Sequence, residues 1–107
     1  MNTNIFTITC NLYDAISSFD AYALICERRK IFELIDRVDL TLRWVDVSDE
    51  EKKCEALHLV DAARNDMETF FRNLFFDSTL AISSYKDALY NVSEALKITK
   101  SLTVINE

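Results

Sequence analysis

The sequence predicts an all-α fold: a small up-down bundle of three to four helices, two or three of them long. A chain of 107 residues has the length of one domain, so residues 1–107 are expected to form a single helical domain. The chain contains no glycine and no proline, the residues that punctuate hairpins, sandwiches and barrels, and this argues against an all-β fold. Apolar residues instead recur at helical spacing through most of the sequence.

The first helix is expected over residues 4–18, although this stretch also has features of a strand. Its apolar residues keep helical spacing: Ile5, Ile8, Leu12 and Ile16. Residues 5–9 are rich in β-branched side chains, so an extended start to the chain is the alternative. Ser17, Ser18 and Asp20 are suitable caps between this helix and the next.

The second and central helix is expected over residues 20–46. Its buried edge is a stripe with alternating spacings of four and three: Leu24, Arg28, Ile31, Ile35, Val38, Leu42 and Val45. Nothing in the sequence interrupts this stripe, which predicts one continuous helix. Arg28 is its only charged member. Its guanidinium is expected either to reach solvent past the edge of the core or to pair with an acidic side chain across an interface.

Two further helices are expected over residues 49–76 and 78–100. Ser48 and Glu51 have the spacing of a capping box, and the acidic residues 49–51 suit the positive end of a helix dipole. The aromatic-rich run of residues 67–76 is expected to fill the widest part of the core. Asp77 or Ser78 can cap the last helix, and residues 101–107 are β-prone and can end the chain in another conformation.

The net charge of −6 and the pI of about 4.7 disfavour nucleic acids and anionic membranes as partners. They are compatible with a basic protein partner, or with acidity that serves only solubility. No apolar run approaches the roughly 20 residues that span a bilayer. Cys10, Cys26 and Cys54 form no C-x-x-C pair, and the first residues lack the pattern of a signal peptide. A reduced, cytoplasmic protein with buried thiols is therefore expected.

Metal and cofactor sites are poorly supported. Cys54 and His58 lie four residues apart, and Glu55 with His58 has the E-x-x-H form that helical di-iron proteins use twice. His58 is the only histidine, so the second half of such a site cannot be built. The sequence predicts no metal and no cofactor.

An enzyme is likewise not expected. Loops of the phosphate-binding and nucleophile-elbow types need glycine. Glu33, Asp36 and Asp39 form an acidic ladder similar to those that bind magnesium in helical nucleotide pyrophosphatases. However, Arg37 and Arg43 are placed to pair with Glu33 and Asp39 at a spacing of four residues, so a solvated charged face is the preferred interpretation.

One feature of the central helix is not explained by the core. On a helical projection, the side opposite the stripe carries Tyr22, Cys26, Leu40 and Trp44. An exposed aromatic beside an aliphatic side chain is typical of a binding anchor. The alternative is that the N-terminal segment or residues 102–105 cover them. The predicted partner-binding residues are Tyr22, Leu40, Trp44, Asp46, Asp49, Glu50, Glu51 and Glu55, with the acids guiding association.

The leading hypothesis is a non-enzymatic, acidic helical interaction protein. It would act as a protein-binding inhibitor of the immunity-protein, antitoxin or anti-host-factor type. The alternative is a homo-oligomeric structural protein, such as a dimer or an export-chaperone-like adaptor, because long helices in so short a chain leave apolar surface over. A magnesium-dependent nucleotide hydrolase with an acidic ladder is the third hypothesis.

Overall fold

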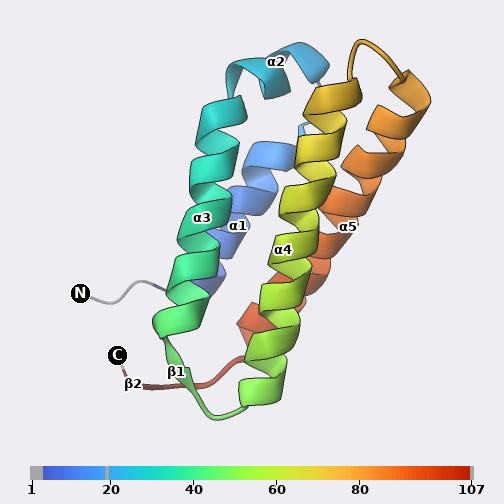
Figure 1. Cartoon of the computed structure of the whole chain (residues 1–107). Coiled ribbons are helices and arrows are strands. Elements are labelled where there is room, and N and C mark those ends of the chain that lie inside the picture. Colours follow the sequence, from blue (N-terminus) through green and yellow to red (C-terminus); the bar gives the residue numbers. More distant parts are fainter. Residues whose placement is uncertain (1–3, 19, 107) are drawn as a thin grey trace.

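The computed structural model describes residues 4–18 and 20–106, which form five helices and a two-stranded sheet (Figure 1). The helices are α1 (Ile5–Ser17), α2 (Ala21–Cys26), α3 (Arg28–Trp44), α4 (Glu50–Asn73) and α5 (Ser78–Ser101). The strands are β1 (Asp46–Val47) and β2 (Val104–Asn106), which pair antiparallel. The predicted all-α class is confirmed, whereas the described residues form five helices rather than three or four.

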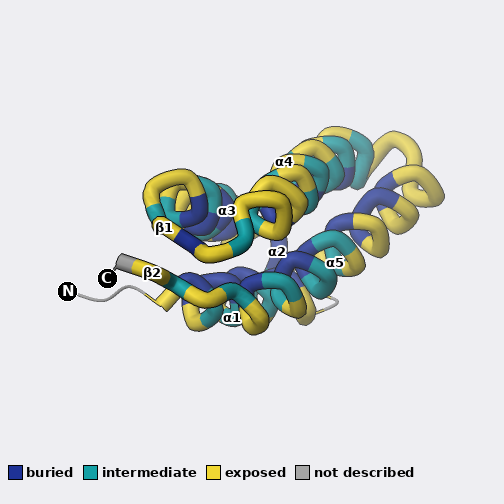
Figure 2. Tube along the Cα trace, turned by 90° about the horizontal axis from the view of Figure 1, so that it is seen from below, coloured by how far each residue is buried: buried dark blue, intermediate teal, exposed yellow. Residues whose placement is uncertain are grey.

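The four longer helices run alternately up and down and lie in two layers (Figures 1 and 2). One layer holds α3 and α4, and the other holds α1 and α5. Contacts join α1 to α3, α3 to α4, α4 to α5 and α5 to α1, so each long helix touches two neighbours. Short α2 crosses one end of the bundle, and the β1–β2 pair lies at the other end. The β-prone tail thus ends as a strand, and the N-terminal stretch is helical from Ile5.

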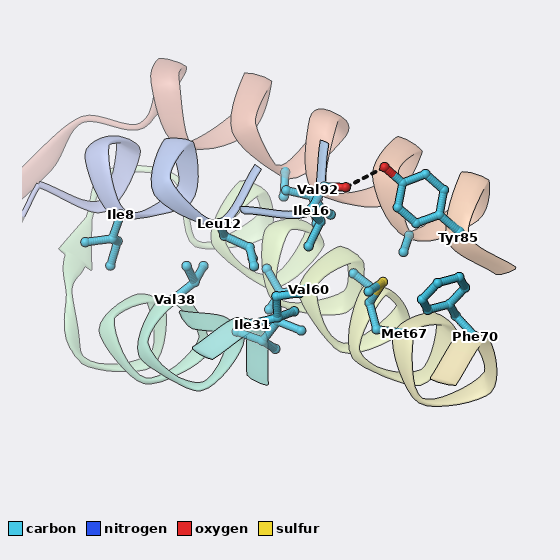
Figure 3. Close-up of a cluster of buried hydrophobic side chains, with 14 of the residues drawn as sticks. Ile8, Leu12, Ile16, Ile31, Val38, Val60, Met67, Phe70, Tyr85 and Val92 are labelled. Carbon is cyan, nitrogen blue, oxygen red and sulfur yellow. Dashed lines mark hydrogen bonds between the residues drawn. The ribbon is translucent and has the colours of Figure 1, made fainter. Parts of the chain in front are cut away.

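The core runs between the two layers and consists of the residues that helical spacing selects (Figure 3). Its buried members are Ile5, Ile8, Leu12, Ile16, Leu24, Ile31, Ile35, Val38, Leu42, Ala56, Val60, Ala63, Met67, Phe70, Ala81, Tyr85, Ala88, Val92 and Ala95. The Tyr85 hydroxyl donates a hydrogen bond to the backbone carbonyl of Ile16, which ties α5 to the end of α1. A polar group buried with such a partner avoids the desolvation cost that an unpaired one carries.

The prediction of one continuous helix over residues 20–46 is wrong, because the helix is interrupted at Glu27. This residue has φ −97° and ψ 8°, outside regular helix geometry, and no side chain caps the start of α3. The hydrogen bonds from Glu27 N–H to the Ala23 carbonyl and from Ile31 N–H to the Glu27 carbonyl are nevertheless retained. The change of direction therefore needs no glycine or proline, and it lets α2 cross the end of the bundle with Leu24 buried.

The aromatic run of residues 67–76 fills the core only in its first half, contrary to expectation. Phe70 is buried and Phe71 half-buried, but Phe75 and Phe76 are 81% and 88% exposed. The reason is that α4 ends at Asn73, whose carbonyl accepts the N–H groups of Phe76 and Asp77 in the turn that follows. The turn carries both phenyl rings beyond the reach of the core.

Side-chain caps define most helix starts. The carboxylates of Asp20, Asp49 and Asp77 accept backbone N–H groups at the starts of α2, α4 and α5, and Asn4 does the same for α1. The expected Ser48–Glu51 capping box is not formed, because Asp49 is the residue that accepts the Lys52 N–H. The acids Glu50 and Glu51 do lie in the first turn of α4, as the sequence indicated.

One polar contact between α4 and α5 yields a pH-dependent prediction. Asn91 Nδ2 donates a 2.8 Å hydrogen bond to Asp66 Oδ2. Partial burial raises the pKa of Asp66, the bond from Asn91 opposes this, and the charge of Asp87 adds to the increase. Because folding raises the pKa of Asp66, the protonated carboxyl stabilises the folded state relative to the unfolded state, and it does so only at low pH. That contribution is lost as pH rises through the raised pKa.

We therefore expect Asp66→Asn, which keeps an oxygen to accept from Asn91, to raise the free energy of unfolding at pH 7 by a few tenths of a kcal/mol. The gain should disappear below pH 3.8, the ordinary pKa of the group. Urea unfolding at several pH values measures this, with exposed Asp14→Asn on α1 as the control. A loss of stability at pH 7 would show that the charged form of Asp66 is favoured in the folded protein.

Candidate functional site

Leu40 and Trp44 form an exposed apolar pair on α3. They lie four residues apart, on the side of the helix away from buried Val38 and Leu42. Trp44 is 80% exposed and Leu40 is 58% exposed. Among the described residues, the C-terminal tail does not cover this pair, because the tail forms β2, which pairs with β1. An exposed indole over an aliphatic neighbour is therefore available to a partner.

The predicted acids lie at the same end of the molecule as this pair, and two of them, Asp46 and Glu50, are linked to the end of α3. Asp46 follows Trp44 by two residues in β1 and is exposed. Glu50 begins α4, its side chain is 69% exposed, and it lies 4.0 Å from Lys53 Nζ. Lys53 in turn donates to the backbone carbonyls of Arg43 and Val45 at 3.2 and 2.8 Å. The first turn of α4 is thereby held against the last turn of α3. We call Leu40, Trp44, Asp46 and Glu50 the Trp44 surface.

Lys53 is the residue that fixes this arrangement. Its side chain is only 12% exposed, and its ammonium satisfies carbonyls at the α3 C-terminus, where the helix dipole is negative. We expect Lys53→Ala to lower the free energy of unfolding by about 1–2 kcal/mol. The matched control, exposed Lys52→Ala, should change it by less than about 0.5 kcal/mol. Equal effects in chemical denaturation would contradict a capping role for Lys53.

The other predicted binding residues are not brought to the Trp44 surface. Tyr22 is 77% exposed but lies on α2, at the opposite end of α3, about 25 Å away for a helix of 17 residues. Glu51 and Glu55 each lie two residues from Lys53, so they project from roughly the opposite side of α4. Asp49 lies nearby, but its carboxylate caps α4.

The three carboxylates of the acidic ladder on α3 form ion pairs with arginine side chains. Arg43 Nε donates to Asp39 Oδ2 at 2.8 Å, and this bond together with the charge of Asp39 raises the pKa of Arg43. Asp36 is bonded by Arg64 of α4. Glu33 pairs with Arg29 at 3.5 Å, not with Arg37 as the sequence suggested. Each carboxylate of the ladder thus faces a guanidinium.

The cysteines and the histidine do not form a cluster that could hold a metal ion within the described part of the chain. Among the described residues, no group of three or more histidine, cysteine, aspartate or glutamate side chains lies close enough to hold a metal ion. Cys54 and His58 are both exposed on α4. The three thiols form no disulfide, and the expectation that they are buried is wrong for Cys26 and Cys54, which are exposed, while Cys10 is half-buried.

Two surface features were not anticipated from the sequence. The first is the exposed pair Phe75 and Phe76 in the turn between α4 and α5. The second is an open groove of about 430 Å³ between α3 and α4, lined by Arg28, Phe32, Glu68, Phe71 and Arg72. Arg28 is exposed, so its side chain reaches solvent, the first of the two expectations, and its guanidinium lies 5.3 Å from the centre of the Phe71 ring. No carboxylate of the described residues forms an ion pair with it. The only sequence signal for the groove is the charge at position 28 of an otherwise apolar stripe.

Comparison of the chain with known protein families, with curated proteins and with solved structures found no match. No helix within the described residues combines the length and the apolar character needed to cross a membrane.

Proposed function

We propose that this protein is a non-enzymatic protein-binding module of the cytoplasm that inhibits its partner, as immunity proteins, antitoxins and anti-host factors do. The observation that carries the proposal is the 80% exposure of Trp44, the only tryptophan of the chain, beside exposed Leu40. Tryptophan is among the residues most enriched at the energetic centres of protein interfaces. The Trp44 surface is therefore the proposed centre of contact.

The energetics support an anchor role for this side chain. A tryptophan buries about 150–250 Å² when it is fully covered. At about 25 cal/mol per Å², covering the exposed part of Trp44 is worth about 3–5 kcal/mol before the costs of association. Left in water, the same area contributes nothing to folding. A partner that offers an apolar pocket for the indole would recover this energy.

The charge of the surface selects the kind of partner. Asp46 follows Trp44 by two residues, and the whole chain carries −6. Glu50 begins α4, whose first turn Lys53 holds to the end of α3. Complementary charges accelerate association and reject like-charged proteins. We propose a partner with an apolar pocket bordered by lysine or arginine side chains.

The experiment that tests this proposal is a pull-down from the native host with the tagged full-length protein. The bound proteins are washed at low and then at high salt and identified by mass spectrometry. We expect one stoichiometric, basic partner that is retained less well at high salt, because screening weakens exposed charge pairs. Recovery of the chain alone would contradict the inhibitor proposal.

A second candidate, a homo-oligomeric structural adaptor, is favoured by the exposed Phe75–Phe76 pair. Two neighbouring phenyl rings at a turn are unusual on the surface of an isolated small domain, and a second copy could cover them. Light scattering separates the candidates. A dimer that resists dilution, and that dissociates when both phenylalanines are changed to serine, would favour the adaptor.

A further inference from the structure

The groove between α3 and α4 has a composition unlike the rest of this acidic protein. Its walls are the rings of Phe32 and Phe71, whose centroids lie 5.9 Å apart, and Arg28 and Arg72 border them. Glu68 is its one carboxylate, so the groove carries a formal charge of about +1 on a chain of −6. The local sign of charge is reversed.

Neither guanidinium of the groove pairs with a carboxylate among the described residues, although that of Arg28 lies over the Phe71 ring. Over the described residues, the ion pairs within 4.0 Å involve Arg29, Arg43, Arg64, Lys53 and Lys97, and neither Arg28 nor Arg72. Both side chains are exposed. Arg28 also opens α3, where the helix dipole disfavours a cation, so intrahelical electrostatics do not explain its position. Guanidinium forks bind carboxylates with two parallel hydrogen bonds.

A further exposed aromatic side chain, Phe75, follows the groove-lining Phe71 in the sequence beyond the end of α4. It lies four residues after Phe71, and Leu74 between them keeps helical φ and ψ, so we expect Phe75 on the same side of the chain as Phe71. With 81% of its surface exposed, Phe75 offers a further apolar contact. A ligand that matches this surface carries carboxylates next to an aromatic or branched aliphatic side chain.

We infer that the groove is a docking site for an acidic peptide segment of a protein partner, with a Glu or Asp beside an apolar residue. The carboxylates bind Arg28 and Arg72, and the apolar side chain packs on Phe71 and Phe75. Complementarity of charge selects this occupant, because Glu68 would repel the denser charge of a phosphate more strongly than that of a carboxylate. The site lies at the opposite end of α3 from the Trp44 surface and is independent of it. The protein would thus contact a basic surface at one end and an acidic segment at the other.

The test is an NMR titration of the isotope-labelled full-length protein with a blocked Glu-Leu-Phe-Glu peptide. We expect shift changes centred on the amides of Arg28, Phe32, Phe71 and Arg72. The peptide with glutamine in place of glutamate should bind about tenfold more weakly or worse. The double variant Arg28→Gln, Arg72→Gln should lose affinity for the glutamate peptide to a similar extent.

The control variant is Arg29→Gln, which removes a neighbouring exposed arginine that pairs with Glu33 and does not line the groove. Arg29→Gln should leave the affinity for the glutamate peptide unchanged. Trp44→Ala should also leave it unchanged, and this result distinguishes binding at the groove from binding at the Trp44 surface. Equal binding of both peptides, unchanged binding to the double variant, or shift changes centred elsewhere would overturn the inference. So would equal shift changes with inorganic phosphate, or self-association that depends on Arg28 and Arg72. Circular dichroism verifies that each variant is folded.

Discussion

Replacing Leu42 with alanine is expected to lower the free energy of unfolding by about 3 kcal/mol, within a range of about 2–5 kcal/mol. Leu42 lies on α3 with no exposed surface, and α3 contacts both α1 and α4. The substitution removes three buried carbon atoms and leaves a cavity that neighbouring helices cannot fully close. A domain of this size has a net stability of about 5–15 kcal/mol, so the loss is a large share of the total.

Leu40→Ala is the matched control, since the same substitution is made two residues away on the opposite face of α3. Leu40 is 58% exposed, so its truncation should change stability by less than about 0.5 kcal/mol. Urea or thermal unfolding measures both variants. Similar losses at the two positions would mean that the side of α3 assigned to the core is incorrect.

Trp44→Ala is expected to weaken binding to the proposed protein partner by about 2–4 kcal/mol, which is roughly 30-fold to 1000-fold in Kd. The free protein should keep its stability, because Trp44 contributes little buried area to the fold. As the only tryptophan, Trp44 also reports on binding directly. Its fluorescence should be that of a solvated indole in the free protein and should shift to shorter wavelength when the partner covers it.

Two results would contradict this placement. One is an affinity of Trp44→Ala equal to that of the wild type in titration calorimetry. The other is a tryptophan emission that does not change when the partner is saturated. Tyr22→Ala serves as the control, since Tyr22 is exposed to a similar degree but lies at the other end of α3.

The core of the long helices could be predicted because helical spacing alone determines it. Ile31, Ile35, Val38 and Leu42 were placed on one buried edge from their positions in the sequence, and all four are fully buried. Amphipathic periodicity is a direct consequence of the 3.6-residue turn and of the need to remove apolar area from water. The exposure of Leu40 and Trp44 follows from the same periodicity, since they lie opposite that edge.

The break at Glu27 could not be predicted in the same way. The hydrogen bonds around Glu27 are retained, and no glycine, proline or side-chain cap marks this point in the sequence. Tertiary packing decides the change of direction, because α2 covers one end of the bundle with Leu24. The helical projection that placed Tyr22 and Trp44 on the same side of one helix assumed a continuous helix, whereas the two residues lie on separate helices, α2 and α3.

The turn after α4 was missed because the apolar pattern continues past the end of the helix. Residues 74–76 continue the apolar pattern, but only Leu74 packs against the core, whereas Phe75 and Phe76 are exposed. Asp77 was recognised as a possible cap for α5, and it is the cap. A cap at Asp77 requires the preceding residues to leave the helix, so the exposure of Phe75 and Phe76 could have been inferred from it.

The Trp44 surface is tested most directly by a parallel pull-down from the native host with three tagged baits: the wild type, Trp44→Ala and Tyr22→Ala. Quantitative mass spectrometry measures the amount of each co-purified protein per bait. We expect one basic protein that the wild type and Tyr22→Ala recover equally and that Trp44→Ala does not recover. Equal recovery of that basic protein by all three baits, or no basic partner with any of them, would contradict the assignment of the Trp44 surface as a protein-binding site.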